Sequence, residues 1–309
     1  MYKKWKIVSI FSILLTFLVT LTVHANDEEV INEKLGVPIV VYGESLSEAQ
    51  KQEVKRLLNV DETSNVKEIT VTAKDLVKYI NGDPNSQMFS SAKITRLNEG
   101  EGLKVNQVTP ENITEVTDEM YANALLTAGI KDAQIDVASP IKVTGHSALT
   151  GIYKAYEESG GEELDRVRLE ISNDELNLAT DLAKKEGLNQ EAVSQLFTEI
   201  KQEMADQVPS NREDIEKIVD EQLKSLNIQL SEADRQKLID LFDRMRSINI
   251  NFEEVKNQLN DIAKQLKDKI NDVIQKEGFW NKLIDGIVSF FQAIINFFQA
   301  IINFFKELF

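Results

Sequence analysis

The chain has 309 residues, of which 51 are acidic and 35 are basic, so its formal net charge at neutral pH is −16. Such an acidic balance argues against nucleic-acid binding, which requires a basic surface, and against electrostatic attraction to anionic lipid. The chain has no Cys, which excludes disulfides and cysteine nucleophiles, and it has two His, too few for an ordinary zinc site.

Residues 1–25 have the pattern of a secretory signal peptide. Three Lys precede an uncharged, mostly apolar run from Ile7 to Val23, and Val23-His24-Ala25 resembles the small-residue cleavage pattern. We expect cleavage after Ala25 and therefore an exported protein, extracellular or associated with the cell envelope; the alternative is an uncleaved membrane anchor. Without this segment, 32 basic residues face 51 acidic ones, a net charge of −19.

Residues 26–158 alternate between strand and helix signals, which is typical of an α+β or mixed α/β domain with a small mixed sheet. Ser47 followed by Gln50 predicts a capping box, and Gly129 predicts the end of a helix that starts at Thr117 or Asp118. Strands are expected at 37–42, 69–72, 92–97, 103–108 and 133–137. The sequence Glu-Gly-Glu-Gly at 99–102 predicts a β-hairpin between the third and fourth strands.

Three segments of this domain carry a family resemblance. They are Met-Tyr-Ala-Asn-Ala-Leu-Leu-Thr-Ala-Gly-Ile at 120–130, Val-Ala-Ser-Pro at 137–140 and Ala-Leu-Thr-Gly-Ile-Tyr-Lys-Ala-Tyr-Glu at 148–157. Together they resemble a family of exported proteins, found mainly in Firmicute bacteria, that is catalogued as domain of unknown function 1002. The resemblance extends over about residues 27–275. It implies a bacterial, extracytoplasmic protein and brings no activity and no site residues.

Residues 159–278 are expected to be helical, after a break at Gly160-Gly161. Helices are predicted at about 162–185, 190–206, 211–226, 231–247 and 252–276. Apolar residues at a 3-4-3-4 spacing predict a packing seam on the last of these. The seam comprises Phe252, Val255, Leu259, Ile262 and Leu266. The preceding helix offers a partner face of Leu238, Leu241, Phe242 and Met245, so a helical hairpin or bundle follows.

Residues 279–309 form a hydrophobic, amphipathic C-terminal segment with a seven-residue repeat. The sequence Gln-Ala-Ile-Ile-Asn-Phe-Phe at 292–298 recurs at 299–305, and no charge occurs from Gly286 to Phe305. As a helix, this segment has a narrow polar stripe and a wide apolar face. We expect that face to insert into lipid or to pack against another helix. Its residues are Trp280, Leu283, Ile287, Phe290, Phe291, Ile294, Phe297, Phe298, Ile301, Phe304, Phe305 and Leu308.

Several arrangements of this segment remain open. It can lie in a membrane interface, where Trp280 suits an anchor, or span a bilayer in a bundle whose Asn and Gln residues hydrogen-bond between helices. It can also pair with copies of itself or with an upstream helix, because a strict seven-residue repeat is a coiled-coil signature. The remaining arrangement is an ordinary core helix. The partners predicted are therefore a lipid membrane or further copies of the chain.

The sequence Gly145-His146-Ser147-Ala148-Leu149 is the segment most similar to a catalytic motif. It resembles a nucleophile elbow, but Leu149 stands where the second Gly is required, and the other His of the chain lies in the signal segment. We expect Ser147 to be a helix N-cap with His146 exposed beside it. The sequence also lacks an EF-hand loop and a phosphate-binding loop. No catalytic, cofactor-binding or metal-ligating residues are predicted, and a small-molecule ligand cannot be named.

Two functions remain after these exclusions. The first is a non-enzymatic exported protein that uses its C-terminal segment for membrane contact or self-association. The second is a hydrolase with an unrecognised carboxylate site in the α/β domain, because acidic residues are abundant.

Overall fold

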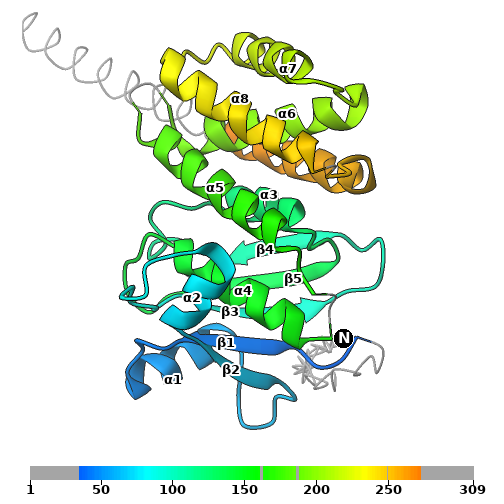
Figure 1. Ribbon diagram of the computed structural model, residues 1–309. Coiled ribbons are helices and arrows are strands. Elements are labelled where there is room, and N and C mark those ends of the chain that lie inside the picture. The colour runs from blue at the N-terminus through cyan, green and yellow to red at the C-terminus, as the bar shows by residue number, and fades with distance from the viewer. Residues whose placement is uncertain (1–34, 161–162, 186–187, 249, 273–309) are drawn as a thin grey trace, which may run out of the picture.

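A mixed five-stranded sheet forms the base of the molecule (Figure 1). The structure, a computed structural model, describes residues 35–160, 163–185, 188–248 and 250–272; residues 1–25 and 279–309 lie outside these ranges. The strand order is β2-β1-β3-β5-β4, with β1 parallel to β2, β4 parallel to β5, and β3 antiparallel to both β1 and β5. The strands are β1 (Ile39–Gly43), β2 (Lys67–Val71), β3 (Ser91–Arg96), β4 (Leu103–Gln107) and β5 (Ala133–Ala138). The predicted mixed sheet is confirmed.

The predicted hairpin between β3 and β4 is wrong, because β5 lies between these strands. Two strand spacings separate β3 from β4, about 10 Å, which a tight turn cannot span. The connection at 97–102 instead wraps around the start of β5. There the Asp132 carboxylate accepts hydrogen bonds from the backbone N–H groups of Gly100 (3.0 Å) and Gly102 (2.8 Å). The fully buried side chains of Ala133, Ile135 and Val137 suit β5 to this inner position.

Four helices flank the sheet: α1 (Glu48–Leu57), α2 (Ala73–Ile80), α3 (Asp118–Ala128) and α4 (His146–Glu158). The predicted capping box of Ser47 and Gln50 is present at α1. Thr117 caps the start of α3, and Gly129 ends it in the left-handed conformation, as predicted. The alternation of side chains along β1 separates the two faces. Val40 and Tyr42 pack under α1, and Ile39 and Val41 belong to the main core.

The region after the sheet is helical, as predicted. It contains α5 (Arg166–Ala183), α6 (Gln190–Gln207), α7 (Arg212–Ser225) and α8 (Glu232–Ser247). A 3-10 turn, Glu253–Val255, then leads into helical residues 256–272. Helix α5 begins later than expected because Asp165 is its N-cap and accepts a hydrogen bond from the backbone N–H of Arg168. None of the helices within the described ranges is both long and apolar enough to cross a membrane.

The five predicted seam residues are all buried; Phe252 and Val255 lie at the 3-10 turn, and the other three lie on the last helix. Ion pairs and hydrogen bonds join this helix to α6 through Lys256–Asp206 and Gln202–Asn260, and to α3 through Lys269–Glu119. The predicted partner face on α8 is also buried, and its Phe242 ring lies 5.7 Å from Phe197 of α6. The helices therefore form a bundle rather than a two-helix hairpin.

Helix α3 joins the sheet to this bundle. Every residue from Glu119 to Ala128 is buried, which is typical of a helix packed on all sides. It contacts β4 on the sheet and α5 and α6 in the bundle. One continuous apolar core consequently runs from Ile39 in β1 to Leu266 in the last helix.

Candidate functional site

Two adjoining pockets lie along one face of α5, and we call them together the α5 cleft. Asn173, Asn177, Thr180 and Lys184 line it, and their spacing of four, three and four residues places them on one side of the helix. The larger pocket has a volume of about 550 Å³ and the smaller one about 370 Å³. Both volumes lie in the range of small-molecule sites.

The larger pocket is lined by both apolar side chains and side-chain amides. Leu76, Ile80, Phe89 and Val143 supply the apolar surface. The lining includes four side-chain amides, three exposed and one half-buried, that have no hydrogen-bond partner among the described residues. These amides belong to Asn81, Gln87, Asn173 and Asn177. Two come from α5 and two from the segment after α2, so two separate parts of the chain supply them.

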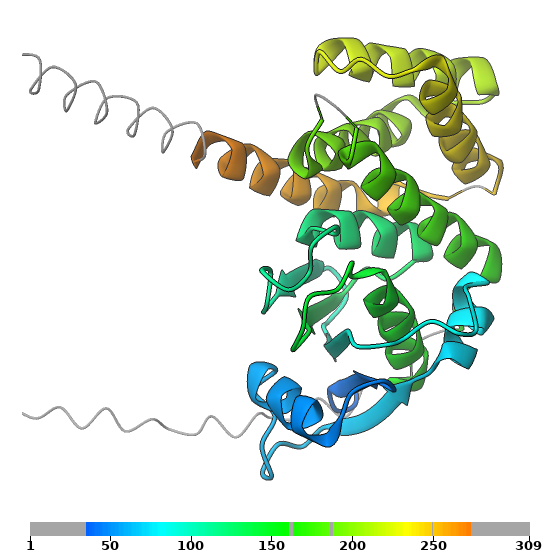
Figure 2. The same ribbon diagram turned by 90° about the vertical axis from the view of Figure 1, so that its left-hand side faces the viewer.

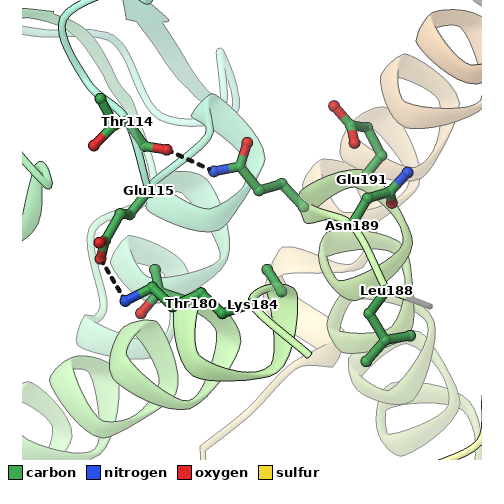
Figure 3. A pocket seen from close by; sticks show the side chains of 9 residues that line it. Thr114, Glu115, Thr180, Lys184, Leu188, Asn189 and Glu191 are labelled. Atoms are coloured by element: carbon green, nitrogen blue, oxygen red, sulfur yellow. Dashed lines mark hydrogen bonds and ion pairs between the residues drawn. The ribbon is translucent and has the colours of Figure 1, made fainter. Parts of the chain in front are cut away.

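The smaller pocket is more polar and partly closed by its own side chains (Figure 3). Lys184 pairs with Glu115 at 2.9 Å, and this bond raises the pKa of Lys184. Gln190 donates a hydrogen bond from Nε2 to the carbonyl of Thr114 at 3.1 Å. Glu191 and Glu115 lie on opposite sides of the view in Figure 3. Lys184, Glu115 and Gln190 of this pocket therefore already have partners within the protein.

His146 joins the two pockets. Its Nε2 lies 3.1 Å from Oγ1 of Thr180, whose hydroxyl donates to the carbonyl of Asn177 at 3.0 Å. The threonine proton is thus engaged, so His146 donates from Nε2 and keeps a lone pair on Nδ1. Burial lowers the pKa of His146, which leaves the ring neutral at pH 7. Two predictions are wrong here: Gly145, not Ser147, is the N-cap of α4, and His146 is half-buried.

The cleft lacks the groups that the hydrolase alternative requires. Among the described residues, Asp83 is the one carboxylate lining the larger pocket; Glu115 and Glu191 both line the smaller pocket, and Glu115 is paired with Lys184. Two free carboxylates are therefore not brought together in either pocket. Ser147 lies next to His146 on α4, and the described residues show no hydrogen bond between their side chains. Within the described ranges, no cluster of three or more His, Asp or Glu residues fits a metal ion.

A second polar cluster lies wholly inside the molecule, where α3, α5 and α6 meet. The Lys201 ammonium is fully buried and contacts the Glu175 carboxylate at 2.5 Å, the carbonyl of Asn123 at 2.7 Å and Oγ1 of Thr127 at 2.8 Å. Thr127 in turn donates to Glu175 at 2.6 Å. Burial lowers the pKa of Lys201, and Glu175 opposes this effect. The ammonium donates two hydrogen bonds to α3 and forms an ion pair with α5, so the cluster connects three helices, and its residues line neither pocket of the cleft.

The sequence anticipated little of this geometry. The twelve apolar residues from Trp280 to Leu308 lie outside the described ranges, so their role stays a prediction. The amides of α5 were missed, although Asn173 and Asn177 have the i,i+4 spacing that places them on one helix face. Nothing local indicates that the segment after α2 approaches them. Lys201 and Glu175 were also missed, because buried charges look like ordinary surface charges in a sequence.

The comparisons with known proteins agree with the resemblance noted in the sequence. Residues 42–262 match the model of the family described as "Protein of unknown function (DUF1002)". The chain is also 40% identical, over 268 residues, to "Uncharacterized protein YpuA" of Bacillus subtilis (strain 168). That alignment covers 84% of this chain and 89% of the relative. No solved structure matches the chain. The chain belongs to the DUF1002 family.

Proposed function

We propose that this member of the DUF1002 family is an exported, non-enzymatic protein that is held at a membrane surface by residues 279–309. The observation that carries the proposal is that the last described helix stops packing against the rest of the protein before it ends. Leu266 is its last fully buried residue, and residues 267–272 remain helical but are exposed or half-buried. Figure 2 shows this helix, in orange, running out from the bundle. The last described residue, Asp272, is therefore exposed on the surface of the protein, and the uncharged stretch 286–305 follows 14 positions later in the sequence.

The surface formed by the described residues offers no membrane-binding site of its own. The exposed large apolar side chains among the described residues are Val77 of α2, Val167 of α5, and Ile141 and Val208 of two connecting segments. Scattered residues of this kind make no membrane-binding patch. The acidic balance of the chain gives no attraction to anionic lipid. Membrane contact therefore has to come from an apolar segment, and the twelve-residue face that begins at Trp280 supplies one.

The chain carries its own probe for this contact. Once residues 1–25 are removed, Trp280 is the single Trp, because the other one is Trp5. We expect its fluorescence to shift to the blue when phosphatidylcholine vesicles are added to the chain from Asn26 to Phe309. We also expect anionic vesicles to bind no more tightly than neutral ones. A spectrum that is already blue in buffer and is unchanged by lipid would instead place Trp280 in a core or an oligomer, which sedimentation would distinguish.

Two matched variants distinguish insertion of the apolar face into lipid from nonspecific adsorption to vesicles. Phe290, Phe297 and Phe304 recur at one position of the repeat, and the triple Phe→Ser variant removes three large apolar side chains. Burial of each Phe contributes about 1.5–3 kcal/mol, so vesicle affinity should fall by about a thousandfold or more. The control changes Asn296 and Asn303 of the polar stripe to Ser and should bind as the parent does. Equal binding by both variants would refute the proposal.

A further inference from the structure

We propose that the larger pocket of the α5 cleft binds a neutral sugar of one or two rings. Its volume of about 550 Å³ accommodates a ligand of that size. A pyranose presents a rim of hydroxyl groups and a face of C–H groups. The lining offers both kinds of partner, namely four side-chain amides and several apolar side chains.

The amides are suited to hydroxyl groups. Each Asn or Gln side chain provides two donors and one acceptor, which matches a hydroxyl that both donates and accepts. Asn173 and Asn177 come from α5, and Asn81 and Gln87 come from the segment after α2. Asn173 is half-buried and the other three are exposed, and none of the four has a hydrogen-bond partner among the described residues. The Nδ1 lone pair of His146 adds an acceptor on a ring that its bond to Thr180 orients.

The apolar residues and the charge of the pocket lining indicate which sugars can bind. Phe89 is half-buried, so its ring is available to the C–H face of a sugar beside Leu76 and Ile80. Asp83 is the one charged side chain of the lining, and it already accepts hydrogen bonds from Asn85. A carboxylate disfavours anionic ligands, and no Lys or Arg of the lining offsets it. Phosphorylated and acidic sugars are therefore poor ligands.

Saturation-transfer NMR on the full chain tests the proposal, because it observes the ligand and tolerates weak binding. The probes are glucose, N-acetylglucosamine and maltose, with glucuronate as the charged comparison and triglycine as the peptide comparison. We expect saturation of the neutral sugars, strongest at the C–H protons of one face, and little saturation of glucuronate. No transfer to any of the three neutral sugars would overturn the proposal. A stronger response from triglycine would assign the pocket to peptide backbone and would also overturn it.

Two Asn→Ala variants locate the binding. Asn177 is exposed on α5, so Asn177→Ala removes an amide from the lining without disturbing the core. Asn257 is likewise exposed and helical, lies outside the cleft lining and has no side-chain hydrogen bond, so Asn257→Ala is the control. We expect Asn177→Ala to weaken the best probe about fivefold and the control to leave it unchanged. Equal affinity in both variants, with unchanged circular dichroism, would refute the assignment.

Discussion

The ion pair of Lys201 and Glu175 is the contact whose loss should destabilise the protein most. Lys201→Met replaces the ammonium by an apolar group of similar length and leaves Glu175, which is 2% exposed, without its counter-charge. Removing one partner of a buried pair costs about 3–5 kcal/mol. The same change removes the donors to the Asn123 carbonyl and the Thr127 hydroxyl. Because a domain is stable by about 5–15 kcal/mol in total, much of that stability would disappear.

A double-mutant cycle measured by urea denaturation distinguishes the pair from its surroundings. Replacing both residues by Met removes both buried charges, and such exchanges are often neutral or stabilising. We therefore expect the double variant to be more stable than Lys201→Met by at least about 2 kcal/mol. The control is Lys217→Met, which breaks an exposed pair with Glu221 at 3.9 Å and should cost less than about 1 kcal/mol. The reasoning is refuted if Lys201→Met costs no more than this control.

Three further predictions concern single positions. Gly145→Ala should destabilise the protein by about 2 kcal/mol or more in urea denaturation, because φ is +105° and a Cβ would lie 2.7 Å from the Tyr121 hydroxyl; Gly100→Ala, at φ +87° in open space, should cost only about 1 kcal/mol. The pKa of His146 is lower in the folded protein than in the unfolded chain, so on acidification the unfolded chain takes up the imidazole proton at a higher pH. Stability should therefore fall as the pH drops from about 6.5 through the pKa of the folded state. The fall in melting temperature between pH 7 and pH 5 should be smaller in His146→Gln. Val208→Gly should raise the melting temperature by a few degrees, because Val208 has φ +47° and is 75% exposed, so glycine relieves strain and loses little packing; a lower melting temperature would contradict this.

Local signals in the sequence were good guides to where elements start and end. Helix α1 begins at the capping box of Ser47 and Gln50, and α3 begins after Thr117 and ends at Gly129, as predicted. These signals are reliable because capping depends on groups within a few residues of each other. The same reasoning failed at Ser147. Gly145 already starts α4, where φ is +105° and the Ile113 and Tyr121 side chains leave no space for a Cβ. The packing of distant residues, not the local hydroxyl, decided that boundary.

The site was less predictable than the fold. In the sequence, Asn177 looks like an ordinary polar surface residue. Only the structure shows that it lines the same pocket as Asn81 and Gln87. His146 was expected to be exposed, and Thr180, 34 positions away, covers it. A pocket forms where separate elements come together. The residue pattern of one element cannot predict which other element it will contact.

By itself, the sequence determined the mixed sheet, the order of the helices, the buried seam that ends at Leu266, and membership in the DUF1002 family. These features rest on hydrophobic period, caps and residue identity, which act over a few positions. The tertiary structure alone decided that β5 separates β3 from β4, that Lys201 is buried against Glu175, and that amides from two separate parts of the chain line the larger pocket of the α5 cleft. Each of these depends on which distant surfaces bury the most apolar area together, a property of the whole chain.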